Sequence, residues 1–383
     1  MNRHGFAFTV HARCPETAAR QATFDTPHGP VSTPAFMPVG TRATVKGAMP
    51  RDLREIGSQM LLANTYHLHL RPGEEVVRKL GGLHGMMAWD GPILTDSGGY
   101  QVFSMGDINR VTEQGVRFKS IVDGSMIDLT PERAVDIQQA LAADVQMAFD
   151  HCPSDPTDRK LVSEATDRTH RWLERGVRHH RATGGEDRGQ ALFGIVQGGA
   201  FEDLRAASVD AVCSHDLIGY AIGGVSVGED REAMRLAVSA AAPRLPEDRP
   251  RYLMGVGTPR DFFDAIERGI DLFDCVTPTR HARNHMAFTT EGIRNLRNQG
   301  YAEDPRPLDP NCDCPCCTQY SRGTLRHLSV TQEMLGGMLL TLHNLRFFHR
   351  LMQRIREAIP AGRLLALRDE VVEASSRRLT PED

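Results

Sequence analysis

The chain has 383 residues, of which 40% are hydrophobic and 25% charged, and its formal net charge is −4. No apolar run approaches the about 18 residues that a membrane span requires, and the first residues lack the apolar core of a signal peptide, so we expect a cytoplasmic protein. An acidic chain is not a uniformly basic nucleic-acid-binding protein, so a polyanionic partner would have to bind at a local basic patch.

Short apolar runs that end abruptly in polar or glycine residues recur along the chain and are typical of buried parallel strands. Helical periodicity separates them, as in "LTPERAVDIQQALAA", where Thr130 can cap a helix that begins at Pro131. The alternation predicts a (β/α)8 TIM barrel of the α/β class. A doubly wound open sheet is the alternative, but no strand is followed by a Gly-x-Gly-x-x-Gly turn. The eight runs are "PAFMPVGT", "QMLLANTYHL", "GPILTDSGG", "DVQMAFDHC", "ALFGIVQGG", "GYAIGGVSVG", "RYLMGVGTP" and "DLFDCVTPTR".

Three segments add to a minimal barrel. An N-terminal antiparallel pair with a turn at "TPHGP" precedes the first barrel strand, and "FKSIVDGSMIDL" predicts a hairpin after the third. The segment after the last strand, "NLRNQGYAEDPRPLDPNCDCPCCTQYSRG", is too long and proline-rich for an ordinary loop. We expect residues 1–383 to form one barrel domain, with a C-terminal subdomain at about 284–350 inserted after the last strand.

The inserted segment carries Cys312, Cys314, Cys316 and Cys317, which lie too close together for a disulfide framework and suggest a zinc site. Such a site needs four ligands. Ser329 and Gln332 have the spacing of a capping box that would open a long helix, and His343 on that helix is a candidate ligand. The isolated Cys14, Cys152, Cys213 and Cys275 are expected to be small buried hydrophobic residues.

In a TIM barrel the residues that follow each strand form one ring around the active site. A single Asp at such a position is as often a helix cap, but three carboxylates with a glutamine and glycine amides suit displacement at an anomeric carbon. Tyr100 and Met254 can sandwich a planar base, although each alone is more often core. The residues alone therefore indicate glycosyl transfer or hydrolysis. The ring comprises Asp96, Asp150, Gln197, Gly223, Gly224, Gly255 and Asp274.

Several long motifs resemble those of the bacterial tRNA-guanine transglycosylases over nearly the whole chain. The resemblance implies a pentosyltransferase that exchanges the wobble guanine of tRNAs with GUN anticodons for 7-aminomethyl-7-deazaguanine, a queuosine precursor. It also implies double displacement through a covalent ribosyl-aspartate intermediate, contact with the anticodon stem-loop, and a homodimer. The motifs are "ILTDSGGYQVFS", "MAFDHC", "GIVQGG", "YAIGGVSVGE", "RYLMGVGTP", "LFDCVTPTRHARN", "CDCPCCTQYSRGTLRHL" and "LLTLHNL".

The resemblance assigns roles to individual positions. Asp274 matches the nucleophile and Asp96 the general acid/base. One structural Zn2+ falls on Cys312, Cys314, Cys317 and His343, with Cys316 left as a non-ligand. The positions that match base-binding residues are Asp96, Ser97, Gly98, Gly99, Tyr100, Asp150, Gln197, Gly224, Val225 and Met254. The positions that match anticodon-loop contacts are Gly255, Val256, Gly257, Thr258, Pro259, Arg260, Asp261, Thr279, Arg280, His281, Ala282 and Arg283.

Three other functions are alternatives to a transglycosylase. A sugar hydrolase barrel explains paired carboxylates but not a closed Cys3His site beside an arginine-rich segment. A non-catalytic tRNA-binding relative would often lack the nucleophile, and the archaeal relatives carry further C-terminal RNA-binding domains. Within the transglycosylase interpretation, Cys152 and Val227 are expected to wall the side of the pocket toward which a 7-substituent projects, and to exclude the bulkier queuine.

Overall fold

The computed structural model describes residues 3–104, 109–225 and 231–383. Within these ranges, eight parallel strands close into a barrel, with β14 paired to β4 to complete the ring. The predicted TIM barrel is confirmed, and each of the eight apolar runs supplies one strand. The strands are β4 (Ala35–Gly40), β5 (Leu61–Ala63), β6 (Ile93–Thr95), β10 (Val145–Met147), β11 (Ala191–Val196), β12 (Gly219–Ile222), β13 (Arg251–Leu253) and β14 (Leu272–Cys275).

The barrel strands are buried on both faces, and every residue of β11 is buried. Met37, Leu62 and Phe193 belong to an apolar cluster inside the barrel, while other strand side chains pack outward against helices. Burial on both faces explains why the sequence shows continuous apolar runs and not an alternating pattern. Closure brings the carboxyl ends of all eight strands to one end of the barrel.

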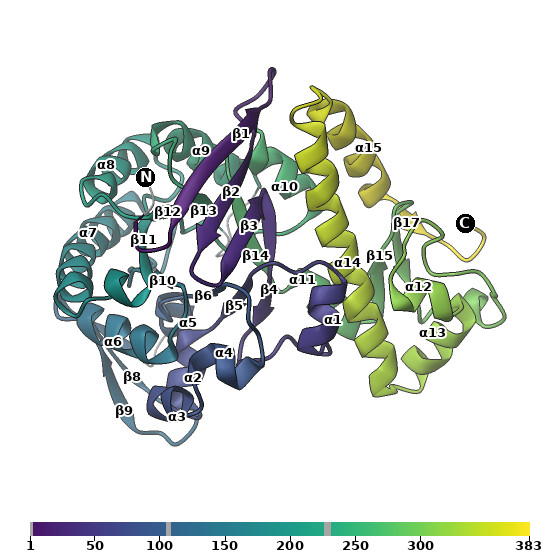
Figure 1. The fold of residues 1–383 in the computed structure, drawn as a ribbon, viewed down its shortest axis with the longest axis horizontal. Helices are drawn as coiled ribbons and strands as arrows, with labels where there is room; N and C mark the ends of the chain where they lie inside the picture. Colours follow the sequence, from purple (N-terminus) through teal and green to yellow (C-terminus); the bar gives the residue numbers. More distant parts are fainter. Residues whose placement is uncertain (1–2, 105–108, 226–230) are drawn as a thin grey trace.

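Helices surround the barrel (Figure 1). The cap predicted for one of them is confirmed, since the Arg133 amide donates to Thr130 Oγ1 at 3.1 Å and Pro131 is the first helical residue. The helices between the strands are α1 (Pro50–Glu55), α2 (Thr65–Leu70), α3 (Glu74–Lys79), α4 (Gly82–Met87), α5 (Gly99–Ser104), α6 (Pro131–Leu141), α7 (Arg159–Ala182), α8 (Glu202–Cys213), α9 (Arg231–Ala241), α10 (Pro259–Ile266) and α11 (Thr277–Arg283), with 3-10 turns at Glu186–Arg188 and Ala242–Arg244.

The N-terminal strands are confirmed, but the expected pair is part of a three-stranded antiparallel sheet. This sheet consists of β1 (Ala7–Arg13), β2 (Arg20–Thr26) and β3 (Gly29–Thr33). Strand β1 escaped the sequence pattern because its residues are only partly buried or exposed, so it lacks an apolar face. Phe6, Phe24 and Val31 join the apolar cluster of the barrel interior. The sheet therefore covers the amino-terminal end of the barrel.

The second predicted hairpin is also present and gains a strand. β7 (Asn109–Val111), β8 (Val116–Lys119) and β9 (Met126–Leu129) form an antiparallel sheet between α5 and α6. The β8–β9 connection contains Asp123 and Gly124, and Gly124 adopts φ +75°, which favours glycine. The predicted Asp-Gly turn is confirmed.

The chain after β14 forms a subdomain beside the barrel. The long helix α14 lies between the barrel and this subdomain (Figure 1). On the barrel side, Phe348 of α14 packs against Phe36 and Phe262, with ring centroids 5.1 and 5.4 Å apart. Strand β17, which lies outside 284–350, pairs with β16. The helices and strands that follow α11 in the chain are β15 (Met286–Phe288), β16 (Ile293–Asn295), a 3-10 turn (Gln299–Tyr301), α12 (Pro315–Gln319), α13 (Arg322–Val330), α14 (Met334–Ala358), α15 (Leu364–Ser376) and β17 (Arg378–Leu379).

The capping box predicted at Ser329 and Gln332 is wrong. Ser329 is a buried residue of α13, and Gln332 adopts φ +59° in the connection between two helices. Helix α14 begins at Met334, preceded by Glu333, whose side chain makes no capping hydrogen bond. The pattern failed because α13 extends to Val330, so the serine belongs to the end of one helix and not to the start of the next.

In the described part of the chain, no helix combines the length and the apolar character needed to cross a bilayer.

Candidate active site and metal centre

A cavity of about 590 Å³ opens at the carboxyl ends of the barrel strands. The residues that line it come from loops after several strands, so the predicted ring of strand-end residues does converge. Gln197 lies behind the wall and is 2% exposed. The predicted site residues that line the cavity are Asp96, Ser97, Gly98, Gly99, Tyr100, Asp150, Gly224, Val225, Met254, Gly255, Asp274 and Arg280.

Asp274 is fixed by two hydrogen bonds on one carboxylate oxygen. The Tyr252 hydroxyl donates to Oδ1 at 2.6 Å, and the Gly255 amide donates to the same oxygen at 2.7 Å. Burial raises the pKa of Asp274, while these two donors oppose the rise by favouring the charged form. In the described part of the chain both bonds go to Oδ1, which leaves Oδ2 as the oxygen able to attack a substrate.

Asp96 lines the same cavity and also has a raised pKa. The Thr65 amide donates to Asp96 Oδ1 at 2.9 Å, and the Asn64 side-chain amide donates to Oδ2. Burial raises the pKa of Asp96 to about 7, and the negative charge of Asp274 contributes to the rise, although the Thr65 amide lowers it. A carboxyl with a pKa raised toward neutrality is suited to general acid/base work.

Asp150 lines the cavity, and Gln197 supports it from behind the wall. Gln197 Nε2 donates to Asp150 Oδ2 at 2.6 Å, and burial raises the pKa of Asp150 to about 6. Gly224 adopts φ +63°, and a Cβ there would lie 2.4 Å from Gln197 Oε1. A side chain at Gly224 would therefore displace the glutamine that holds Asp150.

Tyr100 and Met254 line the same cavity, as predicted. The side chain of Tyr100 is 45% exposed, which makes it the most accessible large apolar group of the cavity wall, and Met254 is half-buried. Cys152 is buried, lines the cavity and lies 3.8 Å from Asp150 Oδ2. Val227, the other residue expected to set the size of the accepted base, lies outside the described residues.

The first predicted RNA-contacting segment, 255–261, forms the connection from β13 to α10. Thr258 and Asp261 cap α10, since the Asp261 amide donates to Thr258 Oγ1 at 3.3 Å and Asp261 Oδ2 accepts from the Thr258 amide at 3.3 Å. Asp261 also pairs with Arg231 at 3.1 Å. Val256 is buried, whereas Arg260 is exposed. Within this segment Arg260 is thus the cation available to a partner.

The second predicted segment, 279–283, lies on α11 directly after the strand that carries Asp274. Arg280 and Arg283 are exposed, and Arg280 lines the cavity. Thr279 and Ala282 are buried, and the ring of His281 packs against Phe288 with centroids 5.0 Å apart. The helix therefore presents Arg280 to the cavity and packs its small residues against the protein, while the exposed Arg283 donates to the Thr279 carbonyl at 2.9 Å.

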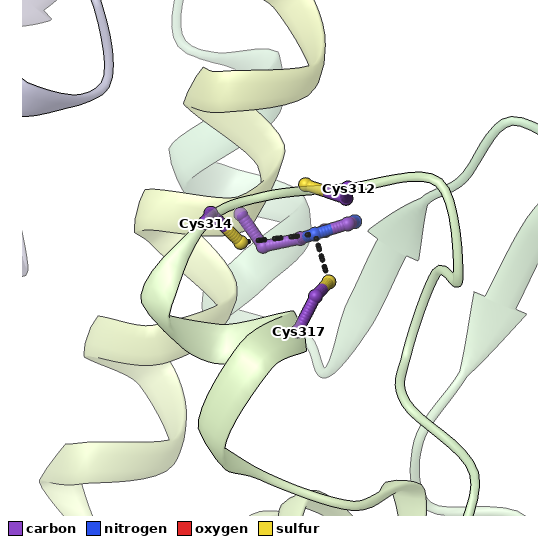
Figure 2. A group of neighbouring side chains, drawn as sticks. Cys312, Cys314 and Cys317 are labelled. Carbon is purple, nitrogen blue, oxygen red and sulfur yellow. Dashed lines mark hydrogen bonds between the residues drawn. The ribbon is translucent and has the colours of Figure 1, made fainter.

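A second cluster lies in the C-terminal subdomain. The ligand atoms of Cys312, Cys314, Cys317 and His343 all lie within 4.8 Å of one another, and all four residues are buried. Figure 2 shows the three cysteine side chains converging from the loop and from α12. His343 Nδ1, from α14, is 3.2 Å from Cys317 Sγ and 3.6 Å from Cys314 Sγ. This group can bind a metal ion.

The histidine of this cluster is oriented for that role. His343 Nε2 lies 2.7 Å from the Phe288 carbonyl oxygen, which accepts its hydrogen and leaves Nδ1 with a lone pair that faces the sulfurs. Three thiolates and one imidazole form a donor set that suits Zn2+. Cys316 is buried but stands outside the converging group.

Sequence reasoning missed three residues at the site: Asn64 and Tyr252, which line the cavity, and Arg205, which supports it from behind. Asn64 directly follows β5, so the rule that found Asp96 and Asp150 could have found it too. The buried Arg205 donates to the carbonyls of Gly199, Val196 and Gly223 at 2.8 to 2.9 Å and thereby holds the β12 loop. Nothing in the local pattern distinguishes this arginine from others on amphipathic helices.

Comparisons with known proteins agree with this geometry. A family model described as queuine tRNA-ribosyltransferase matches residues 14–377. The queuine tRNA-ribosyltransferase of Synechococcus elongatus is 53% identical over 360 residues, which are 94% of this chain and 93% of the relative. The protein of that name from Thermus thermophilus is 54% identical over 358 residues (94% and 91%), and that from Desulforamulus reducens is 52% identical over 354 residues (92% and 94%). The chain belongs to the queuine tRNA-ribosyltransferase family, whose members are pentosyltransferases.

Proposed function

We propose that this protein exchanges the wobble guanine of tRNAs with GUN anticodons for 7-aminomethyl-7-deazaguanine. Family membership supports a tRNA-guanine ribosyltransferase. The observation that carries the mechanism is the pair of carboxylates in one cavity, Asp274 with its charged form supported by two donors and Asp96 with a pKa of about 7. Two carboxylates in one cavity can divide nucleophilic and acid/base work between them.

In the first displacement, Asp274 Oδ2 attacks C1′ of the wobble ribose. The C1′–N9 bond breaks, its electron pair stays with the purine, and protonated Asp96 delivers the proton that the departing guanine requires. In the second displacement, ionised Asp96 accepts the N9 proton of the incoming base. That nitrogen then attacks C1′ and releases the carboxylate of Asp274. Each exchange thus leaves both residues in their starting protonation states.

Asp150 and Gln197 are proposed to read the polar edge of the purine, with the amide of Gly224 beside them. A purine and a 7-deazapurine share this edge, so both can enter one pocket. Tyr100 and Met254 are proposed to cover the two faces of the ring. The cavity volume of about 590 Å³ leaves room for the base together with part of the ribose.

The exposed Arg260, Arg280 and Arg283 are proposed to bind phosphates of the anticodon loop, because guanidinium groups recognise phosphate through paired donors. The homodimer implied by the family is part of the same proposal and is checked by sedimentation of the protein with and without tRNA.

We further propose that the Cys3His cluster binds one structural Zn2+, because four protein ligands leave no position for an activated water. The three cysteines and the histidine would fix α12 against α14. Cys314→Ala should lose zinc in metal analysis and lower the melting temperature, whereas Cys316→Ala should retain one zinc per chain. The reverse result would overturn the ligand set.

The activity is tested with radiolabelled guanine and two unmodified tRNA transcripts that differ only at the wobble position. Label should enter the transcript with guanine at that position and not the matched transcript with adenine there. Unlabelled 7-aminomethyl-7-deazaguanine should then displace the label. Equal labelling of both transcripts, or no displacement, would contradict the proposal.

A further inference from the structure

A second group of metal-binding side chain types lies at the opposite end of the barrel from the cavity. His28 belongs to the turn between β2 and β3, His84 lies in α4, and Asp144 directly precedes β10. Their ligand atoms lie within 4.8 Å of one another. The cluster is separate from both the cavity and the Cys3His group, since Asp144 precedes the amino end of its strand while the cavity opens at the carboxyl ends.

One carboxylate faces both imidazoles. Asp144 is fully buried, with Oδ1 2.7 Å from His28 Nδ1 and Oδ2 3.2 Å from His84 Nε2. The Ile93 amide donates to Oδ2 at 2.8 Å and fixes the carboxylate in place. The two imidazole rings stack with centroids 3.7 Å apart and an interplanar angle of 17°. Three segments distant in sequence therefore present two nitrogens and a carboxylate at one point.

The hydrogen bonds and charges at this point are incomplete. His84 Nε2 is buried, and its contact with Asp144 Oδ2 at 3.2 Å is poorly aligned for a hydrogen bond. A buried nitrogen with a poorly aligned partner loses part of a hydrogen bond, which an ion or a water at this point would restore. Among the described residues, the only basic side chains within ion-pair distance of Asp144 are the two histidines. A divalent cation would satisfy both the nitrogen and the carboxylate.

We propose that His28, His84 and Asp144 bind a divalent transition-metal ion of the Zn2+ or Co2+ type. Two imidazoles and one carboxylate suit such ions, and water can complete the coordination because the side chain of His28 is 42% exposed. The ion connects the N-terminal sheet to α4 and to the start of β10. Its role is structural: it anchors the sheet that covers this end of the barrel.

Cobalt titration tests the site in the intact, untagged protein with the Cys3His cluster left in its zinc-loaded form. Thiolate-bound Co2+ absorbs intensely through sulfur-to-metal charge transfer, whereas Co2+ held by imidazole and carboxylate shows only weak bands. The two sites are thus distinguished in one spectrum. We expect one equivalent of Co2+ to bind without thiolate absorption and to raise the melting temperature.

Two variants and one matched control complete the test. His28→Gln and His84→Gln should each lose the cobalt equivalent and the rise in melting temperature. His179→Gln should retain both, because His179 lies 2.6 Å from Asp136 in a histidine–carboxylate pair outside the cluster. If His84→Gln fails to fold, the more exposed His28→Gln decides alone. Absence of cobalt binding beyond the thiolate site, or its retention in His28→Gln, overturns the proposal.

Discussion

The two ends of the barrel both hold buried carboxylates, but they surround them differently. At the amino-terminal end, Asp271 is fully buried. Its carboxylate accepts hydrogen bonds from Arg20 Nη2 at 2.6 Å and from Arg20 Nε at 2.9 Å. The Arg251 amide donates to the same carboxylate at 2.7 Å. The bidentate guanidinium compensates the charge of this carboxylate, and its task is to join the N-terminal sheet to β14.

At the carboxyl-terminal end, Asp150, Asp274 and the partly exposed Asp96 have hydrogen bonds but no such cation. Among the described residues, their donors include the neutral groups of Gln197, Cys152, Tyr252 and Asn64 and nearby backbone amides. Burial raises the pKa of each of these carboxyls and also that of Asp271, but for Asp271 the Arg20 guanidinium opposes the rise. Burial and a raised pKa therefore do not by themselves indicate function; Asp271 is held by a bidentate guanidinium, whereas the carboxyls that line the cavity are held by neutral donors.

The largest expected effect is on catalysis at the carboxyl-terminal end of the barrel. Asp274→Asn should reduce guanine exchange by about 10⁴-fold or more, because an amide cannot act as the nucleophile. Its melting temperature should stay unchanged or rise, since the variant removes an uncompensated charge. Guanine exchange and thermal melting are measured on the same preparation, with Asp216→Asn, whose side chain is 72% exposed in the parent, as the control. Activity within tenfold of wild type would contradict the assignment.

At the amino-terminal end of the barrel, removing one partner of the buried ion pair should lower the stability of the fold. Arg20→Met leaves Asp271 buried without its cation and should lower the free energy of unfolding by about 3–5 kcal/mol. Urea denaturation measures this loss. The matched control is Arg13→Met, which breaks an exposed pair with Glu247 and should cost about 1 kcal/mol or less. Equal losses in the two variants would remove the distinction between buried and exposed pairs.

The pH dependence of stability tests whether folding raises the pKa of Asp96. Folding raises the pKa of Asp96 from 3.8 to about 7, so the stabilising contribution of its protonated form is complete below about pH 4 and is lost as the pH rises through about 7. The Asp96→Asn variant has no carboxyl to titrate at this position, so it does not lose this stabilising contribution as the pH rises. Its stability relative to wild type should therefore increase from pH 4 to pH 8, by a few kcal/mol at most because the cavity admits solvent. A difference that does not vary with pH would contradict the raised pKa.

The smallest predicted effect concerns the hydroxyl that holds the nucleophile. Tyr252→Phe removes one hydrogen bond to charged Asp274 and should slow exchange about 10- to 100-fold. Loss of this donor raises the pKa of Asp274 further, so the acid limb of the pH–rate profile should move to higher pH. A merely structural role for Tyr252 would lower the rate or the melting temperature without moving that limb.

The barrel and most of the candidate site could be predicted from sequence because each follows from a local rule. Strands buried on both faces appear as apolar runs, and Asp96 and Asp150 follow such runs directly. Tyr252 could not be found in this way. It looks like an ordinary strand residue, and its contact with Asp274 depends on the β13–β14 register, which pairs Tyr252 with Leu272.

Other features depend on contacts between distant segments. Strand β1 is identified by its partner β2 and not by its own pattern, and the false capping box at Ser329 arose because spacing does not reveal where the preceding helix ends. His28, His84 and Asp144 meet only because the barrel closes and the N-terminal sheet covers one end. Sequence patterns report local burial, and such long-range convergence leaves no local signal.

The most direct test of this account is to locate the covalent bond. Wild-type enzyme is mixed with tRNA, denatured during turnover, digested with nuclease and protease, and analysed by mass spectrometry. The account predicts a ribosyl adduct on the peptide that contains Asp274, and no adduct in Asp274→Asn. An adduct on Asp96 or Asp150, or an adduct that persists in Asp274→Asn, would contradict it.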